Sequence, residues 1–162
     1  MNEIKIIIIS DTHRSPESIE EAIRRQPRAD AVIFLGDGLS DAELVSGCHP
    51  ELCFYAVRGN CDFHATLGGA PVPKTAELTL GGRKILYTHG DLFSVKSGLG
   101  GLISEAKRTG ADIVLYGHTH VAREDYINGV YFVNPGSAGG YKPTAALLSI
   151  SDGGVLFSKM EL

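Results

Sequence analysis

Two short stretches of the chain each carry two metal-ligand side chains with one residue between them. Asp11 and His13 follow a run of isoleucines, and His118 and His120 follow the apolar stretch Ile113–Leu115. Side chains at positions i and i+2 of an extended backbone point to the same side, so each pair can face one spot beyond a strand end. Carboxylate and imidazole groups bind first-row divalent metals. The two stretches therefore predict metal binding.

Three further apolar runs end in a ligand-type residue beside a glycine, namely Asp37, Asn60 and His89. In α/β sheets, binding sites form where the carboxyl ends of the strands meet. That rule brings all the ligand-type residues to one edge, and they are too many for one tetrahedral zinc. Two cations that share one carboxylate would suit the set, and such a pair can clamp a phosphoryl group. The predicted ligands are Asp11, His13, Asp37, Asn60, His89, His118 and His120.

Length and composition indicate one globular domain over residues 1–162. Hydrophobic residues make up 43% and charged residues 21%, which suits a folded chain with a full core. The net charge of −4 argues against a general nucleic-acid binder, which normally carries a basic face. It does not argue against an anionic substrate, because bound divalent metals reverse the local field.

The chain also lacks the signals of membrane or secreted proteins. It has no run near the roughly 18 apolar residues that span a bilayer, and no signal-peptide pattern. Its three cysteines, Cys48, Cys53 and Cys61, form no C-x-x-C pair. This favours reduced thiols in a cytoplasmic protein. We expect Cys48 and Cys53 to be small buried residues.

The elements that must position these ligands begin with a strand, a helix and a strand within about 35 residues, which is a parallel βαβ unit. The first strand is β-branched throughout, which is typical of a strand covered on both faces. Later hairpins fit two packed sheets with outer helices. The expected strands are 4–9, 31–35, 53–57, 77–80, 83–88, 112–116, 122–127, 130–133, 145–150 and 155–159; the expected helices are 16–26, 40–46 (capped by Ser40) and 97–109, and residues 63–73 read as loop.

The five ligand motifs, in this order, resemble the calcineurin-like metallophosphoesterase family, and the short chain is most similar to its small bacterial and archaeal phosphodiesterase branch. The resemblance implies a four-layer α/β sandwich of two mixed sheets flanked by helices. It also implies two neighbouring divalent ions, most often Mn, with Fe, Zn or Ni as alternatives. The implied reaction is hydrolysis of a small phosphodiester by in-line attack of a hydroxide that bridges both metals. By position, one metal would be held by Asp11, His13 and His120, and the other by Asn60, His89 and His118, with Asp37 bridging.

The chain departs from the family at the residue after Asn60. Many phosphomonoesterases of the family carry a histidine there, which can protonate the leaving group, whereas this chain has Cys61. A neutral thiol is a poor proton donor at neutral pH. We therefore expect diesters with good leaving groups to be better substrates than monoesters. In the family, the residue at the position of Asp62 orients that histidine; here Asp62 has no such partner and is expected to cap a turn. A second histidine often follows His89 and Gly90 in the family, and this chain has Asp91 there.

Two interpretations remain open for other residues near the motifs. Arg14 and Arg58 could clamp a phosphate, or could be solvated surface charges. Arg14 and Cys61 are the candidate substrate contacts. His49 and His64 end no apolar run, which favours ordinary loop histidines.

Two other classes of function compete with the phosphodiesterase. One is a non-catalytic interaction scaffold, because the family includes a retromer scaffold subunit that resembles this branch. The other is a nuclease, which the acidic balance and the lack of a Lys/Arg run disfavour. The exposed hairpins are compatible with a homo-oligomer. The sequence identifies neither the natural diester nor the metal.

Overall fold

The computed structural model describes residues 2–63 and 66–162, and it opens with the predicted βαβ unit. Strand β1 (Ile4–Ile9) pairs in parallel with β2 (Ala31–Phe34), and helix α1 (Pro16–Arg25) connects them. Ile6 and Ile8 face one hydrophobic core while Ile7 and Ile9 face another. The unbroken β-branched run therefore reflects a strand that is buried on both faces, as predicted.

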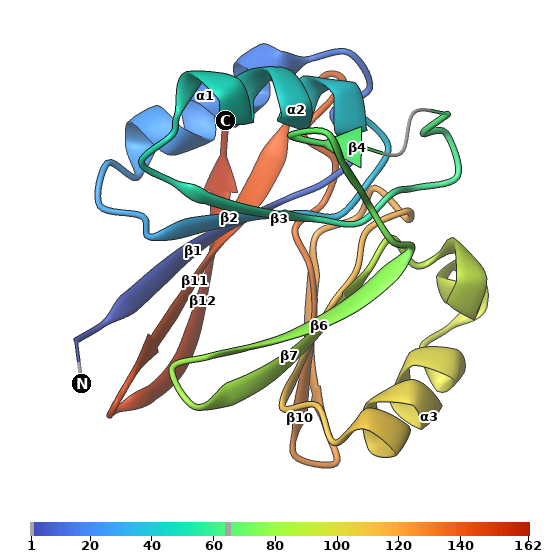
Figure 1. Ribbon diagram of the computed structural model, residues 1–162. Helices are drawn as coiled ribbons and strands as arrows, with labels where there is room; N and C mark the ends of the chain where they lie inside the picture. Colours follow the sequence, from blue (N-terminus) through green and yellow to red (C-terminus); the bar gives the residue numbers. More distant parts are fainter. Residues whose placement is uncertain (1, 64–65) are drawn as a thin grey trace.

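Two five-stranded sheets, each with parallel and antiparallel pairs, form the centre of the molecule (Figure 1). The first has the strand order β12-β11-β1-β2-β3 and the second β6-β7-β8-β10-β9. In both sheets the parallel strands precede the candidate ligands in the chain. The remaining strands are β3 (Cys53–Ala56), β6 (Thr75–Leu80), β7 (Arg83–Thr88), β8 (Ile113–Leu115), β9 (Arg123–Ile127), β10 (Val130–Asn134), β11 (Thr144–Ser151) and β12 (Gly154–Glu161).

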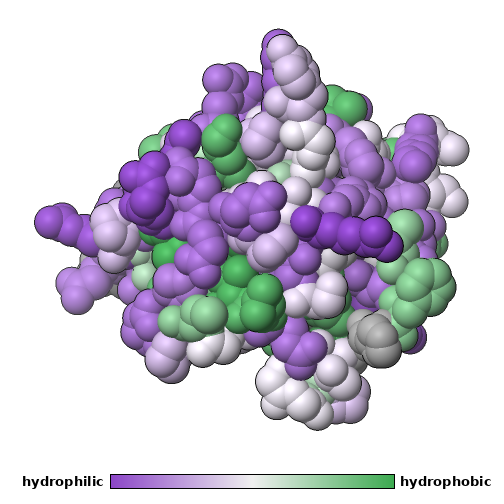
Figure 2. Space-filling view, turned by 90° about the horizontal axis from the view of Figure 1, so that it is seen from above, coloured by the Kyte–Doolittle hydropathy of each residue, from purple (hydrophilic) through white to green (hydrophobic). Residues whose placement is uncertain are grey.

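Helices cover the outer face of each sheet, which gives the predicted four layers. Helices α1 and α2 (Leu39–Cys48) lie over the first sheet, and α3 (Gly100–Thr109) lies over the second (Figure 1). Three hydrophobic clusters separate the layers, one under α1 and α2, one between the sheets and one under α3. The face that carries α1 and α2 is mostly hydrophilic, with a few separate apolar groups (Figure 2).

Several predicted boundaries are wrong for reasons that lie outside the local sequence. Helix α2 begins at Leu39 with Gly38 as its N-cap, so Ser40 lies inside the helix and does not cap it. Helix α3 begins at Gly100 because two 3-10 turns, Asp91–Phe93 and Val95–Ser97, precede it.

The segment expected to be loop contains the two-residue strands β4 (Thr66–Leu67) and β5 (Ala70–Pro71). His64 lies outside the described residues.

The expectation that Cys48 and Cys53 are buried is also wrong, because all three cysteines are exposed free thiols. Cys48 is the last residue of α2, and Cys53 begins β3, which is an edge strand of its sheet. An edge strand leaves one side open to solvent. These positions are therefore exposed although the runs around them are apolar.

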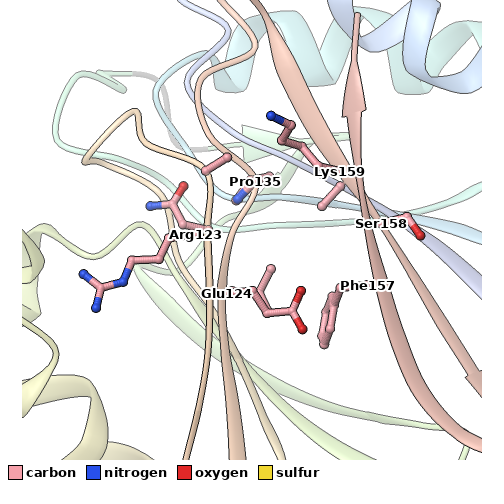
Figure 3. A pocket seen from close by; sticks show the side chains of 10 residues that line it. Arg123, Glu124, Pro135, Phe157, Ser158 and Lys159 are labelled. Carbon is pink, nitrogen blue, oxygen red and sulfur yellow. The ribbon is translucent and has the colours of Figure 1, made fainter.

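A cavity of about 160 Å³ opens between the two sheets, where β9 and β10 face β11 and β12 (Figure 3). Glu124 and Phe157 project into it from opposite sheets. None of the candidate metal ligands lines this cavity. No helix in the described part of the chain is long and apolar enough to cross a membrane.

Candidate metal centre

Side chains from both sheets meet at the carboxyl ends of the strands and form a first group of candidate ligands. The Nε2 atom of His120 lies 3.1 Å from Oδ1 of Asp11, and Nε2 of His13 lies 3.7 Å from the same oxygen. The two Nε2 atoms are 3.3 Å apart. One ligand atom from each of the three residues lies within 4.8 Å of the others, which is close enough for one metal ion to contact all three.

A second group lies directly beside the first. It consists of Asp37, His89 and His118, whose ligand atoms also lie within 4.8 Å of one another. Nε2 of His89 is 3.3 Å from Oδ2 of Asp37 and 3.2 Å from Nδ1 of His118. The same nitrogen is 4.0 Å from Oδ1 of Asp11, which belongs to the first group. The two groups therefore adjoin one another and can form one centre.

The carboxylate of Asp11 is the part of the centre that best fits a bound cation. Its Oδ2 atom accepts hydrogen bonds from the Ser10 hydroxyl (2.6 Å) and the His118 N–H (3.1 Å). Its Oδ1 atom is fully buried and has no hydrogen-bond partner among the described residues. A buried anionic oxygen without a partner is costly, and a metal ion would satisfy it. The donor set of carboxylates and imidazoles fits first-row divalent metals.

The backbone at the centre is strained in a way that the sequence did not reveal. Asp11, His13, Asp37, His118 and His120 all have positive φ angles, between 45° and 68°. Outside glycine this conformation is uncommon and unfavourable, and it clusters at functional sites. Five of the seven predicted ligands adopt this conformation. The strained backbone therefore helps to set the direction in which these side chains point.

His89 is held in one tautomer. Its Nδ1–H donates to the carbonyl oxygen of Leu35 at 2.8 Å, which leaves Nε2 directed at the centre. Burial lowers the pKa of His89, but the hydrogen bond to Asp37 and the charges of Asp11 and Asp37 raise it more, so the net shift is upward. A proton and a metal ion therefore compete for Nε2.

The other members of the second group are in the protonation states that a metal needs. Burial raises the pKa of Asp37, but His89 and the Cys61 N–H outweigh it and lower that pKa to about 2. Burial, with the positive charges of His89 and Lys96, lowers the pKa of His118. At neutral pH the group therefore offers a carboxylate and a neutral imidazole.

Comparison with known proteins agrees with this geometry. Residues 4–153 match the calcineurin-like phosphoesterase superfamily domain. The chain belongs to this superfamily. It is similar to the probable metallophosphoesterase YsnB of Bacillus subtilis, with 36% identity over 83% of the chain and 75% of that protein.

Two other similar proteins have names of different kinds. Vacuolar protein sorting-associated protein 29 of Schizosaccharomyces pombe is 39% identical over 88% of the chain and 76% of that protein. The solved structure of a novel archaeal phosphodiesterase aligns with a TM-score of 0.78 and 25% identity, over 98% of the chain and 100% of that structure. The chain therefore has the fold that was expected for the metallophosphoesterase family.

Two residues outside the predicted ligand set, Asp41 and Asn134, hold the loops that carry the candidate ligands. The Asp41 carboxylate accepts from the Thr12 hydroxyl (2.6 Å) and the Arg14 N–H (3.0 Å). The Asn134 amide donates to the Gly117 carbonyl and the Thr119 hydroxyl, both at 3.0 Å. Each contact spans at least 15 residues in the chain, so no local sequence signal indicated it.

Asp62 has a larger role than the expected turn cap. Its two carboxylate oxygens accept four backbone N–H groups at 2.7 to 2.9 Å. The donors are the N–H groups of Asp37, Gly38, Leu39 and Gly59, so Asp62 joins the turns after β2 and β3 and caps the start of α2. A negative charge at a helix N-terminus is also favourable.

The remaining predicted residues lie at the rim. Asn60 is exposed, and its amide donates to Sγ of Cys61 at 3.4 Å. Arg14 and Cys61 line a depression of about 480 Å³ that also includes His13 and Asp37. Arg58 does not line it, and its Nε is buried without a hydrogen-bond partner among the described residues.

Two other predicted positions are paired elsewhere. Asp91 lies 3.9 Å from Lys74. His49 is paired with Glu20 and Glu51, away from the centre.

Proposed function

We propose that this metallophosphoesterase is a phosphodiesterase that uses two divalent ions, with Mn²⁺ as the preferred metal and Fe, Zn or Ni as substitutes. The observation that carries the proposal is the pair of adjoining ligand groups around the unpartnered Oδ1 atom of Asp11. We assign one ion to Asp11, His13 and His120 and the other to Asn60, His89 and His118, with Asp37 as the shared ligand. The name of the archaeal phosphodiesterase also supports this reaction.

Two bound divalent ions would polarise the phosphoryl oxygens of the substrate and activate water for attack. The chain itself supplies the positioning. The hydrogen bond to Leu35 fixes the ring of His89, and the bonds from Ser10 and His118 fix the carboxylate of Asp11. A site that is organised before the substrate arrives stabilises developing charge without reorganisation.

The preference for diesters rests on Cys61. Although Cys61 is exposed, partial desolvation of its thiol, together with the negative charge of Asp37, raises the pKa of that thiol. The thiol therefore stays neutral and is an even weaker proton donor at neutral pH than a free cysteine. Substrates whose leaving group departs without a proton are favoured. Arg14, which lines the same depression, is the proposed contact for a phosphate oxygen because a guanidinium binds phosphate bidentately.

The test begins with protein stripped of metal and reloaded separately with Mn²⁺, Fe²⁺, Zn²⁺ or Ni²⁺. We expect bis(p-nitrophenyl) phosphate to be hydrolysed faster than p-nitrophenyl phosphate, and hydrolysis to stop in excess chelator. Asp37→Ala and His89→Ala should each abolish metal-dependent turnover. Turnover that persists on verified metal-free protein, or a strong preference for the monoester, would overturn the proposal.

The second candidate function is a protein-interaction scaffold without catalysis. The similarity to vacuolar protein sorting-associated protein 29 favours it. Retention of all seven predicted ligand types favours the enzyme. A chain that binds metal but hydrolyses no diester in the panel would point to the scaffold. We also propose a cytoplasmic location, because a reducing compartment keeps free thiols such as these three reduced.

A further inference from the structure

A second depression reaches the loop that carries two of the candidate metal ligands. Its volume is about 360 Å³, and Thr119, which stands between the ligands His118 and His120, forms part of its wall. Leu99 and Val121 give it apolar lining. The depression that contains Arg14 and Cys61 shares no lining residue with it. One depression is therefore lined by the candidate ligands His13 and Asp37, and the other by the residue between His118 and His120.

The hydroxyl of Tyr116 is an unused hydrogen-bond donor in this second depression. Tyr116 is only 2% exposed, and its ring packs in the hydrophobic cluster under α3. Its hydroxyl has no hydrogen-bond partner among the described residues, yet it is not one of the fully enclosed polar atoms. Buried tyrosine hydroxyls usually have a partner. A hydroxyl that opens into a depression without one is suited to a ligand oxygen.

The depression carries a positive charge as well as this hydroxyl. Lys96 lines the depression and has no ion-pair partner within the described part of the chain. Helix α3 begins at Gly100, just after Leu99, with no acidic residue in its first turn and no side-chain cap, so its positive end is not neutralised.

Arg123 differs from Lys96, because it is paired with Asp125 at 2.6 Å. Its side chain points away from the cavity between the sheets (Figure 3). The depression thus contains an apolar wall, one unpaired cation and one free donor.

We propose that this second depression binds one ester arm of the substrate, an apolar or aromatic group that ends in an anion, and that Lys96 and the Tyr116 hydroxyl contact that anion. The inference rests on the proposed phosphodiesterase function and adds the substrate class. A diester carries two organic groups on one phosphorus atom, and two separate depressions lie at the loops that carry the ligands of the centre that would hold this phosphorus. The depression beside Cys61 receives the group that departs.

The test uses three diesters that release the same p-nitrophenolate. Their second group is methyl, phenyl or 4-carboxyphenyl, so that size and charge are varied in turn. We expect the wild type to prefer the 4-carboxyphenyl diester over the phenyl diester by about tenfold or more in kcat/KM, as a charge-assisted hydrogen bond permits. Tyr116→Phe and Lys96→Met should each reduce this preference to about threefold or less through KM. Tyr116→Phe should leave the methyl diester unchanged, whereas Lys96→Met, which also removes a charge that acts on His118, should change the methyl and phenyl diesters by one common factor.

Direct binding gives a second readout. Non-hydrolysable bis(4-carboxybenzyl)phosphinate should bind each variant about tenfold more weakly than it binds the wild type by calorimetry, whereas bis(benzyl)phosphinate should bind all three alike. Tyr126→Phe and Lys107→Met are matched controls, because Tyr126 is 65% exposed on β9 and Lys107 lies on the exposed side of α3. Both controls should behave like the wild type.

The outcomes separate the two proposals. If the wild type hydrolyses none of the three diesters, the proposed function fails and the inference fails with it. If the wild type hydrolyses them but Tyr116→Phe and Lys96→Met change all three equally, or change none, the second depression does not bind the anionic group and only the inference is overturned. Lys96 is exposed, so Lys96→Met decides the question even if Tyr116→Phe disturbs packing.

Discussion

The candidate metal ligands of this chain are unusual in their backbone conformation as well as in their side chains. Asp37 has a φ of 58° and is directly preceded by Gly36 at 99°, so the chain turns sharply where β2 ends. A conformation of this kind costs about 1–3 kcal/mol at a non-glycine residue and persists only where the surroundings enforce it. Here the carboxylate of Asp62 accepts a hydrogen bond from the Asp37 N–H and so holds Asp37 in this conformation.

Gly59 is the residue whose size decides whether Asp37 can keep this position. A Cβ atom at Gly59 would lie 2.6 Å from the Asp37 nitrogen, and closer still to its Oδ1. We expect Gly59→Ala to displace the Asp37 carboxylate and to weaken Mn²⁺ binding by about 10- to 100-fold. Loss of the contacts that hold a metal ligand in place has an effect of this size. Calorimetric titration of metal-free protein with Mn²⁺ measures the change.

Gly47→Ala is the matched control for this prediction. Gly47 lies in α2, and a Cβ atom there would meet nothing within 4 Å. The control should bind Mn²⁺ as the wild type does. Equal Mn²⁺ affinity for Gly59→Ala and wild type would show that Asp37 tolerates displacement and is not a tight ligand.

At the scale of elements, the first helix pair is joined by a histidine that was expected to be an ordinary loop residue. His49 is the C-cap of α2, and its Nε2 lies 2.8 Å from the Glu20 carboxylate on α1. Its Nδ1 lies 3.0 Å from Glu51. The hydrogen bonds to Glu20 and Glu51 raise the pKa of His49 above its usual 6.5. The histidine is therefore more readily protonated in the folded chain than in the unfolded one.

This shift predicts how the stability of the helix pair depends on pH. A group whose pKa is higher in the folded state stabilises fully below its unfolded pKa, and the effect disappears as the pH rises through the folded pKa. We expect His49→Gln to lower the free energy of unfolding by at most about 1 kcal/mol near pH 5.5, since the pair is partly exposed. The difference should shrink as the pH rises above 6.5.

Urea unfolding of both proteins at several pH values measures this difference, and the histidines of the metal centre cancel in the comparison. Glu20→Gln should reproduce most of the effect, whereas Glu17→Gln, on the exposed first turn of α1, should not. A difference that grows with pH would contradict the assigned sign.

Elements were predictable where local sequence determines them. Asn128 and Gly129 have φ angles of 53° and 80°, the conformation that the Asn-Gly pair predicts for the turn between β9 and β10. The start of α2 was not predictable, because the groups that cap it come from Asp62, more than 20 residues away. Ser40 was predicted to be the cap because the sequence shows only neighbouring residues, and Asp62 is not one of them. The candidate ligands and their order could be identified from the sequence. The long-range hydrogen bonds that orient their side chains could not.

At the scale of the whole molecule, each ligand group joins the two sheets. Asp11 and His13 follow β1 of the first sheet, while His120 follows β8 of the second. In the other group, Asp37 follows β2, and His89 and His118 follow strands of the second sheet. A metal ion bound by either group would therefore cross-link the sheets through side chains, beyond the apolar packing between them.

Metal binding should accordingly stabilise the fold. A ligand that binds only the native state at 100 times its dissociation constant adds about 2.7 kcal/mol, which raises the Tm of a chain of this length by roughly 5–10 °C. We expect Mn²⁺ to shift thermal unfolding by this amount and a chelator to reverse it.

Substitutions that leave one ligand group intact distinguish a cross-link from a general salt effect. His120→Ala removes the second-sheet ligand of the first group, and Asp37→Ala removes the first-sheet ligand of the other. Each variant should lose part of the Mn²⁺-dependent shift, and the double variant should lose most of it, because Asn60 would then be the only predicted ligand that ties the histidines of the second group to the first sheet. Hydrogen exchange should show the lost protection in β1 and β8 together, since these strands lead into the ligand turns of opposite sheets. A full Mn²⁺ shift in the double variant would place the stabilising ion elsewhere on the molecule.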